Sequence, residues 1–304
     1  MLKQMMNGID NEAGVTQVIV VFAMIALLGA SALVIDVGAM MAKRIQFSNT
    51  VDAATLAGVM ELPTQPNKAI QLAGEYVVAN GFDLVDVTIS VGDNDRSLTV
   101  VGNRRHDFYI APILGIRETT LTVRAKAKIG PSKSATGVRP FGIDNQNLIY
   151  GDQVVLKEGG GDGENGNFGA VAFDDSFGAS TFRYNILYGH NGEIEIGDII
   201  DTEPGNMASS ISTVNEVLGS EPYARFDNYN PDSERVWIIP VLDDMDVSGR
   251  DAVTVVGFAA FFIEEIKKNA GEAEVTGRFI EFTTSGEISD TAPDIGVYAM
   301  KLIE

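Results

Sequence analysis

Residues 13–35 read AGVTQVIVVFAMIALLGASALVI, and this stretch decides the architecture of the chain. It holds 23 residues without a charged side chain, bounded by Glu12 and Asp36. As an α-helix it spans ~35 Å, while a bilayer core of about 30 Å needs about 20 such residues. A secretory signal peptide has an apolar core of only about 7–15 residues, and few soluble helices are apolar on every side. The stretch therefore predicts a transmembrane helix.

This helix is expected to continue beyond the membrane. Residues 36–62 contain no proline, and Pro63 then disfavours helix at the residue before it. We expect one helix of about 45 residues, half in lipid and half outside. Small residues four positions apart permit close helix packing in lipid, although alanine is also simply a good helix former. They are Ala26 and Ala30, and Gly38 and Ala42.

Charges near the helix do not decide its orientation. Lys3 lies before the apolar run, while Lys43 and Arg44 lie after it, so the positive-inside rule favours neither side. Asp36 allows two interpretations. It is either hydrated at the membrane surface, or paired with Lys43, Arg44 or a neighbouring chain, because a carboxylate in lipid needs a partner.

The residues around the apolar run form an ordered pattern. Ala13-Gly14 precedes the run, Ile35-Asp36-Val37-Gly38 ends it, and residues 44–58 read RIQFSNTVDAATLAG. In order and spacing, residues 13–60 resemble the N-terminal region of Tad-type (Flp) pilus-assembly TadE/TadG-like proteins. The resemblance implies a pseudopilin-like or minor-pilin-like protein with a cytoplasmic N-terminus and its body outside. It marks these residues for assembly or anchoring: Gly14, Asp36, Gly38, Arg44 and Asp52.

Processing and polymerisation stay open at this point. Pilins that are cleaved after glycine commonly carry Glu at the fifth mature position, and in this chain that position is Ile19. The resemblance therefore does not decide whether the chain is cleaved after Gly14, or whether it polymerises through its N-terminal helix.

The charge of the chain is uneven. Residues 1–130 carry 11 Lys and Arg against 12 Asp and Glu, whereas residues 131–304 carry 11 against 30. A body this acidic is repelled by nucleic acid, whose binders present a basic face. The acidic surface favours solubility, with cation binding as the sharper alternative. The chain has no cysteine, which excludes disulfides, thiolate metal sites and a cysteine nucleophile.

The remaining sequence predicts an α+β protein. A long N-terminal transmembrane or pilin-like helix (1–62) is followed by a small α+β unit (63–130), a linker (131–138) and a larger acidic β domain (139–304). The small unit contains a helix over 67–79, a hairpin with a turn at 93–95, and an alternating strand over 121–129. The segment 106–116 is either helical or irregular.

The larger domain is expected to be a mainly antiparallel sandwich or barrel with a helical insertion. Its apolar runs are short, rich in Val, Ile and Phe, and bounded by turn residues. The predicted strands are 153–157, 170–173, 235–241, 252–262, 274–283 and 296–303, with a helix over 209–218.

Two acidic clusters are candidate calcium ligands, because Ca²⁺ takes six to eight oxygens. They are Asp162, Glu164 and Asn165 in a glycine-rich loop, and Asp243, Asp244 and Asp246. The spacing matches neither an EF-hand nor a phosphate-binding loop, and Asp and Asn also favour plain turns. The two histidines, His106 and His190, fall in different predicted domains, and no nucleophile elbow is present. We expect no enzyme and no cofactor except possible Ca²⁺.

These patterns predict a structural, membrane-anchored component of a Tad-type pilus or surface-filament system at the bacterial cell surface. Its expected partners are the membrane, other pilus-assembly proteins and copies of itself, and not nucleic acid. The alternative is a tethered cell-surface module that binds a cation, glycan or peptide.

Overall fold

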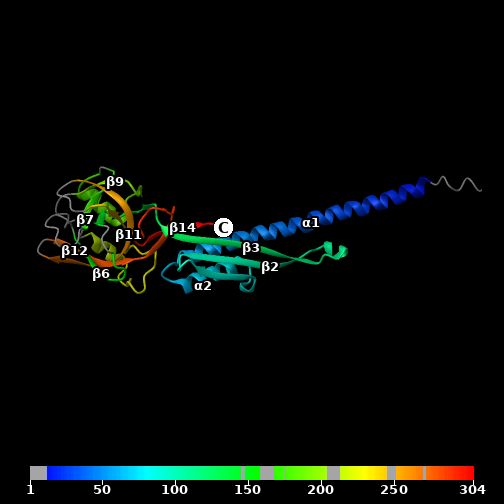
Figure 1. Cartoon of the computed structure of the whole chain (residues 1–304), viewed down its shortest axis with the longest axis horizontal. Coiled ribbons are helices and arrows are strands. Elements are labelled where there is room, and N and C mark those ends of the chain that lie inside the picture. Colours follow the sequence, from blue (N-terminus) through cyan, green and yellow to red (C-terminus); the bar gives the residue numbers. More distant parts are fainter. Residues whose placement is uncertain are drawn as a thin grey trace, which may run out of the picture.

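The structure, a computed structural model, describes residues 12–144, 148–157, 168–174, 176–203, 213–244, 251–269 and 272–304. The molecule is elongated (Figure 1). Helix α1 (Glu12–Val59) runs along it, and its N-terminal half extends beyond the rest of the protein. Two β units follow α1 in the chain (Figure 1). We call them the stem, which packs on α1, and the head, which lies beyond the C-terminal end of α1.

Helix α1 confirms the prediction of a long apolar helix that continues past Asp36. It has 48 residues and no proline, and it ends in a turn before Pro63. Helix α2 (Pro66–Ala79) starts on Pro66, whose missing N–H costs nothing in the first helical turn. It stops at Asn80, and Gly81 follows with a φ of 79°, a left-handed conformation that glycine adopts freely.

The stem is a five-stranded sheet with the order β1-β2-β3-β14-β13. Its strands are β1 (Val87–Gly92), β2 (Ser97–Asp107), β3 (Glu118–Pro131), β14 (Val297–Leu302) and β13 (Phe282–Ser285). The turn between β1 and β2 lies where predicted. Asp93, Asn94 and Asp95 all have positive φ, which short Asp and Asn side chains tolerate better than most. All neighbours are antiparallel except β13 and β14.

The alternating residues of β3 explain the core of the stem. Leu121, Val123, Ala125, Ala127 and Ile129 point to one face and are buried, while the polar residues between them face away. This face packs against the C-terminal half of α1 and against α2 in a single hydrophobic cluster. The stem therefore holds α1 by one side only.

The head is built on a seven-stranded sheet with the order β10-β5-β7-β9-β11-β12-β6. Strand β10 also pairs with β11, so five strands close into a ring and the barrel alternative is the one observed. The strands are β5 (Phe141–Asp144), β6 (Gln153–Lys157), β7 (Phe168–Ala172), β9 (Ile199–Thr202), β10 (Val236–Leu242), β11 (Ala252–Asn269) and β12 (Glu272–Ile280). Helices α3 (Ala179–Tyr188) and α5 (Val214–Ser220) accompany it.

The chain crosses between the two units in ways that the sequence did not indicate. The predicted strand 274–283 divides at Glu281, so that β12 belongs to the head and β13 to the stem. The last strand, β14, pairs with β3 of the stem. Residues 131–138, predicted as a linker, contain strand β4 (Ser134–Thr136), which pairs with β8 (Glu193–Glu195). The head is therefore inserted between strands of the stem.

Candidate membrane anchor and its brace

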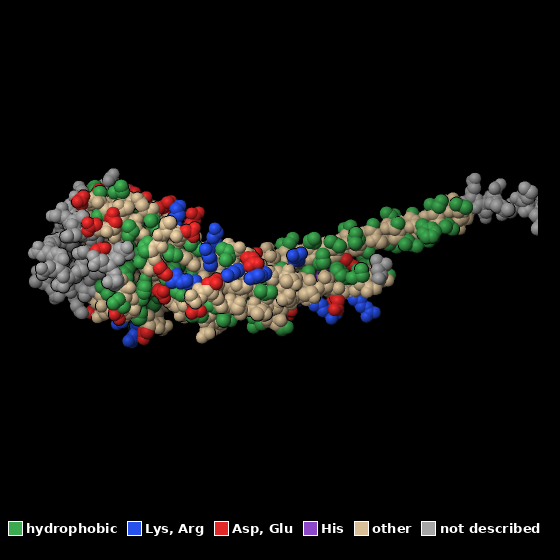
Figure 2. All heavy atoms as spheres, viewed as in Figure 1, with side chains coloured by type: hydrophobic (Ala, Val, Ile, Leu, Met, Phe, Trp, Pro, Cys, Tyr) green, Lys and Arg blue, Asp and Glu red, His purple; other side chains and the backbone are tan. Residues whose placement is uncertain are grey.

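The N-terminal half of α1 presents apolar side chains to every side. Of residues 14–35, only Ala32 is buried, and bulky side chains such as Phe22, Leu27 and Val34 are 67–71% exposed. Figure 2 shows this half as a rod of hydrophobic side chains that projects away from the body. Contiguous apolar surface of this size is rare on proteins that stay in water. The helix is long and apolar enough to cross a membrane, judged by length and composition.

A carboxylate marks the end of this apolar half. Asp36 is 3% exposed, although it lies on α1 directly after Ile35. The loop between β2 and β3 reaches along α1 and covers the Asp36 side chain. Asp36 Oδ1 accepts hydrogen bonds from the N–H groups of Tyr109 (2.8 Å) and Ile110 (3.2 Å). Asp36 Oδ2 accepts from Ile110 (3.1 Å) and Ala111 (2.6 Å).

These bonds form a brace between the helix and the hairpin. The three donating amides are consecutive and open the short 3₁₀ helix η4 (Ala111–Leu114), where N–H groups lack partners of their own. The carboxylate oxygens of Asp36 accept these N–H bonds, so both the buried charge and the free N–H groups gain partners. The negative charge also lies at the positive end of the turn, which is favourable. Asp36 thus fixes the loop at the height where the apolar half of α1 ends.

The brace differs from the two interpretations of Asp36 within the chain, namely hydration and pairing with Lys43 or Arg44. Pairing with a neighbouring chain stays a prediction. The side chain is buried rather than hydrated. Among the described residues, the ion pairs found do not join Asp36 to Lys43 or Arg44. Lys43 Nζ instead donates to Gln46 Oε1 at 3.0 Å, and Arg44 is exposed. The partners of Asp36 are backbone amides, which no side-chain pattern reveals.

The C-terminal half of α1 is fixed in the stem core. Phe47 is fully buried and stacks on Phe82 with 4.7 Å between the ring centroids. Gly58 is the site of closest approach, because a Cβ there would lie 2.4 Å from Leu98 Cδ2 and 2.6 Å from the carbonyl oxygen of Ala69. Only glycine fits between α1, α2 and β2 at this position.

The remaining residues marked by the resemblance have different surroundings. Gly14 and Gly38 are exposed, and a Cβ at either would meet nothing within 4 Å. Asp52 is half-buried on α1, and burial raises the pKa of its carboxyl group. Gly14, Gly38 and Arg44 are thus exposed, whereas Asp36 is buried and bonded within the chain.

The calcium candidates are only partly described. Asp162, Glu164, Asn165 and Asp246 lie outside the described residues. Asp243 Oδ1 accepts the N–H groups of Thr254 (2.8 Å) and Asp244 (3.0 Å), and the bond from Thr254 lowers the pKa of Asp243. Asp243 therefore has the turn-forming contacts expected of aspartate. Within the described part of the chain, no cluster of three His, Cys, Asp or Glu residues is suited to hold a metal ion.

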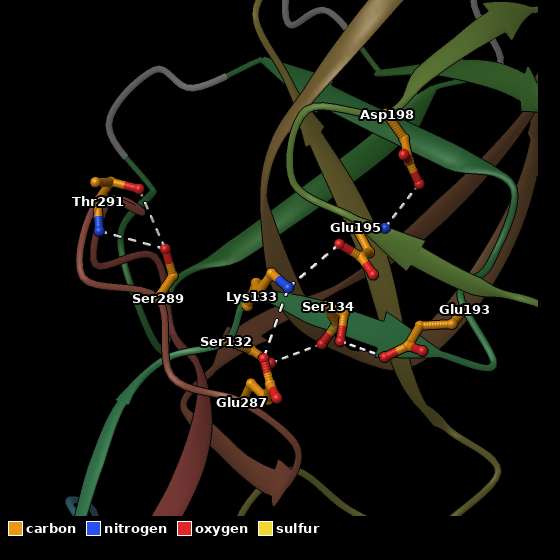
Figure 3. A network of polar contacts seen from close by, with 9 residues as sticks. All are labelled: Ser132, Lys133, Ser134, Glu193, Glu195, Asp198, Glu287, Ser289 and Thr291. Carbon is orange, nitrogen blue, oxygen red and sulfur yellow. Dashed lines mark hydrogen bonds and ion pairs between the residues drawn. The ribbon is translucent and has the colours of Figure 1, made fainter.

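Polar contacts join the head to the stem at the segment 131–138 (Figure 3). Lys133 Nζ lies 3.4 Å from Glu195 Oε2 and 3.6 Å from Glu287 Oε2, so it links β8 to the loop before β14. Ser132 Oγ donates to the carbonyl oxygen of Ser134 at 2.6 Å, and Ser134 Oγ donates to Glu193 Oε1. Ser132 and Ser134 are buried. The chain passes between stem and head twice, after β3 and between β12 and β13, and polar contacts hold the junction together.

An open groove of about 440 Å³ lies on the head. Its lining includes three arginines and two aromatic rings: Arg225, Arg235, Arg278, Phe226 and Phe262. Arg278 pairs with Glu264 at 2.9 Å, and Arg235 donates to the carbonyl oxygens of Ala224 and Leu218. Arg235 is 7% exposed, and its Nε has no hydrogen-bond partner among the described residues. Asp227 and Glu264 also line the groove, so its three arginines leave only a slight positive excess on a domain that is acidic overall.

Sequence reasoning missed the loop that braces α1. Residues 108–116 read FYIAPILGI, nine uncharged residues between two strands. Such a run at the end of a hairpin is unusual, because loops in water are normally polar. That contrast was the available signal, and the proline within the run concealed it by making helix and irregular structure equally plausible.

Comparison with known proteins covers only the helix region. No curated protein and no solved structure matches the chain. Residues 14–61 match the family model described as Putative Flp pilus-assembly TadE/G-like. They contain the apolar half of α1, Asp36 and Gly58, but not the residues that Asp36 and Gly58 contact.

Proposed function

We propose that this protein is a structural component of a Tad-type pilus or surface-filament system, pseudopilin-like or minor-pilin-like and without catalysis. Helix α1 holds it in the membrane with its N-terminus in the cytoplasm, and the head faces outward. One observation carries the proposal. The segment that matches the Tad family is the helix whose first half is apolar and uncovered and whose second half is fixed in a folded stem.

The different surroundings of the two halves of α1 support this role. The exposed half needs lipid or the apolar helices of other subunits around it, because water disfavours such a surface. The packed half passes any load on the anchor to the stem through Phe47 and Gly58. The acidic head then lies far from the membrane, where its charge favours solubility.

Membrane attachment is tested by charging the exposed half of α1. Arg costs about 2.5–3.5 kcal/mol at the centre of a membrane helix. The double variant Ile25→Arg/Leu28→Arg alters two exposed side chains and touches no part of the stem core. We expect the wild-type chain in the membrane fraction and the variant released as a folded soluble protein. The control is Val85→Arg, which charges an 89% exposed apolar side chain of the stem. Wild-type protein in the soluble fraction would refute the anchor.

Topology and assembly need separate measurements. The chain lacks cysteine, so a single Tyr223→Cys variant places one thiol on the head, at a side chain that is 91% exposed. An impermeant maleimide should label it on intact spheroplasts, and labelling only after lysis would reverse the proposed orientation. Electron microscopy of purified protein distinguishes a filament subunit from a membrane-bound assembly component.

The arginine groove of the head favours one alternative, a tethered module that binds an acidic glycan or peptide. Arg225 and Arg278 line the groove beside the rings of Phe226 and Phe262, so a ligand carboxylate on an apolar body would compete with Asp227 and Glu264 for these arginines. Binding to the native state raises its melting temperature by mass action. A melting temperature that is the same in sodium glucuronate and in sodium chloride would count against this alternative.

A further inference from the structure

The loop that binds Asp36, residues 108–116, has an unusual surface, and we call it the hairpin tip. It contains no charged residue. Tyr109 is 72% exposed, Ile113 84% and Ile116 56%. Few contacts within the protein cover these side chains, so the tip presents apolar surface at the end of a long hairpin. A patch of this kind on a soluble protein marks an interaction site.

Seven backbone N–H groups of the hairpin tip donate within the protein. Asp36 accepts the N–H groups of residues 109–111. Four further N–H groups donate to carbonyl oxygens within the loop or its base, namely those of Phe108, Ile113, Gly115 and Ile116, and Pro112 has no N–H. Irregular backbone is costly in lipid because its polar groups lose water. Those donors already have partners, so moving them out of water costs less than it would for free N–H groups.

The position of the hairpin tip follows from Asp36. Residues 15–35 form 21 residues of helix and span ~31 Å, about the thickness of a bilayer core. When they cross the membrane, Asp36 lies at the headgroup level. The tip is hydrogen-bonded to Asp36, so it lies at the same level and beside the helix. Tyrosine side chains prefer this interface, since one end is apolar and the other polar.

The charges next to the hairpin tip fit a membrane surface. Residues 36–44 and 104–118 together carry five Lys and Arg and three Asp and Glu. Arg105 is shared with Asp107 and Glu118, at 2.9 and 2.6 Å. A groove of about 430 Å³ between α1 and β2 is lined by Lys43, Arg104 and His106, among others. This end of the molecule is mildly basic, which suits phosphate headgroups, while the strongly acidic head lies at the other end.

From these observations we propose that the hairpin tip is a second membrane contact, in which Tyr109, Ile113 and Ile116 enter the lipid interface beside α1. The inference rests on the proposed membrane anchor. Asp36 acts as the positioning residue that holds the tip at the bilayer surface. Two attachment points restrict tilt and rotation of the stem about α1, which a single helix does not.

Depth-dependent quenching tests this proposal in the full chain. Single cysteines at position 113 (I113C), 34 (V34C) and 223 (Y223C) each replace an exposed side chain in a protein without cysteine. Each is labelled with an environment-sensitive fluorophore and reconstituted into phosphatidylglycerol–phosphatidylethanolamine vesicles. Spin-labelled lipids then quench from the headgroup region or from deep in the chains.

We expect the label at position 113 to be blue-shifted and quenched by the shallow spin label, with loss of that quenching when Asp36→Ala is added. The label at position 34 should be quenched by the deep spin label, and the label at position 223 by neither. Quenching at 34 without quenching at 113 overturns the second contact and leaves the anchor standing. A blue shift at 113 without lipid quenching also overturns it, since protein then covers the tip. No quenching at 34 refutes the anchor itself.

Discussion

Replacement of Gly58 by alanine is the sharpest test of how α1 is held in the stem. The added Cβ would lie 2.4 Å from Leu98 Cδ2, 2.6 Å from the carbonyl oxygen of Ala69 and 3.0 Å from Ala73 Cβ. Carbon atoms in contact prefer about 3.5–4.0 Å, so α1 and α2 have to separate or Leu98 has to leave its position. Leu98 is fully buried and the oxygen belongs to the backbone of α2, so neither moves freely.

The loss of stability in Gly58→Ala follows from two opposing effects. Overpacking of a core costs about 1–3 kcal/mol. Alanine is the better helix former by about 1 kcal/mol in a helix interior, and less in the last turn of α1 where Gly58 lies. We expect a net loss of about 1–2 kcal/mol. For a folded unit of this size, that lowers the melting temperature by about 2–8 °C.

Circular dichroism of the detergent-solubilised chain measures the effect, and Gly38→Ala is the matched control. Gly38 lies in the same helix, and a Cβ there meets nothing within 4 Å. The control should melt at the wild-type temperature or slightly above it. A Gly58→Ala protein that melts with the control would refute the close approach of α1, α2 and β2 at this position.

Three further predictions concern α1. Asp36→Ala removes the acceptor for the N–H groups of residues 109–111, so those amides should exchange with solvent faster, as measured by hydrogen exchange. Phe47→Ala empties a fully buried site against Phe82 and should lower the free energy of unfolding by about 3–5 kcal/mol in a urea titration. Asp52→Asn should raise the melting temperature at pH 7 and leave it unchanged at pH 3. Burial raises the pKa of the Asp52 carboxyl, so its stability contribution is complete below the unfolded pKa of about 3.9 and is lost as pH rises through the folded pKa.

Each of these predictions has an internal control. Amides of the β1–β2 pairing should keep their exchange rates in Asp36→Ala, since they bond within the sheet. Phe22→Ala, which alters a 67% exposed ring of the same helix, should leave the urea midpoint unchanged where Phe47→Ala shifts it. Equal melting temperatures of Asp52→Asn and wild type at pH 7 would mean that water reaches the carboxylate more freely than its surroundings indicate.

The parts of the fold that the sequence predicts are those with local signals. The apolar run of α1 lacks proline, and the Asp-Asn-Asp turn after β1 favours positive φ, so each can be read within a few residues. Strand β3 alternates in burial, and its composition alternates with it. The fold class, the long helix and the resemblance to the Tad family all rest on such signals, and the structure and the family match confirm them.

The parts that escaped prediction depend on distant partners. Asp36 meets amides 73–75 residues later in the chain, and backbone amides leave no mark on the sequence. Residues 274–283 have the same strand-forming character throughout, yet Glu281 separates a strand of the head from one of the stem. Which sheet a strand joins is decided by pairing with remote strands, such as β3 with β14, and not by its own composition.

The return of the chain to the stem through β13 and β14 has a mechanical consequence. The head is connected to the stem at the end of β3 and at the start of β13, so a pull on the head is shared by two strands. Strand β3 is paired with β2 from Ser97 with Lys128 to Asp107 with Glu118. Tension along the molecule would act parallel to these strands and load the hydrogen bonds together in shear. They would then have to break at the same time and not one after another. The stem can therefore pass force between the apolar half of α1 and the distant acidic head while its strands stay paired.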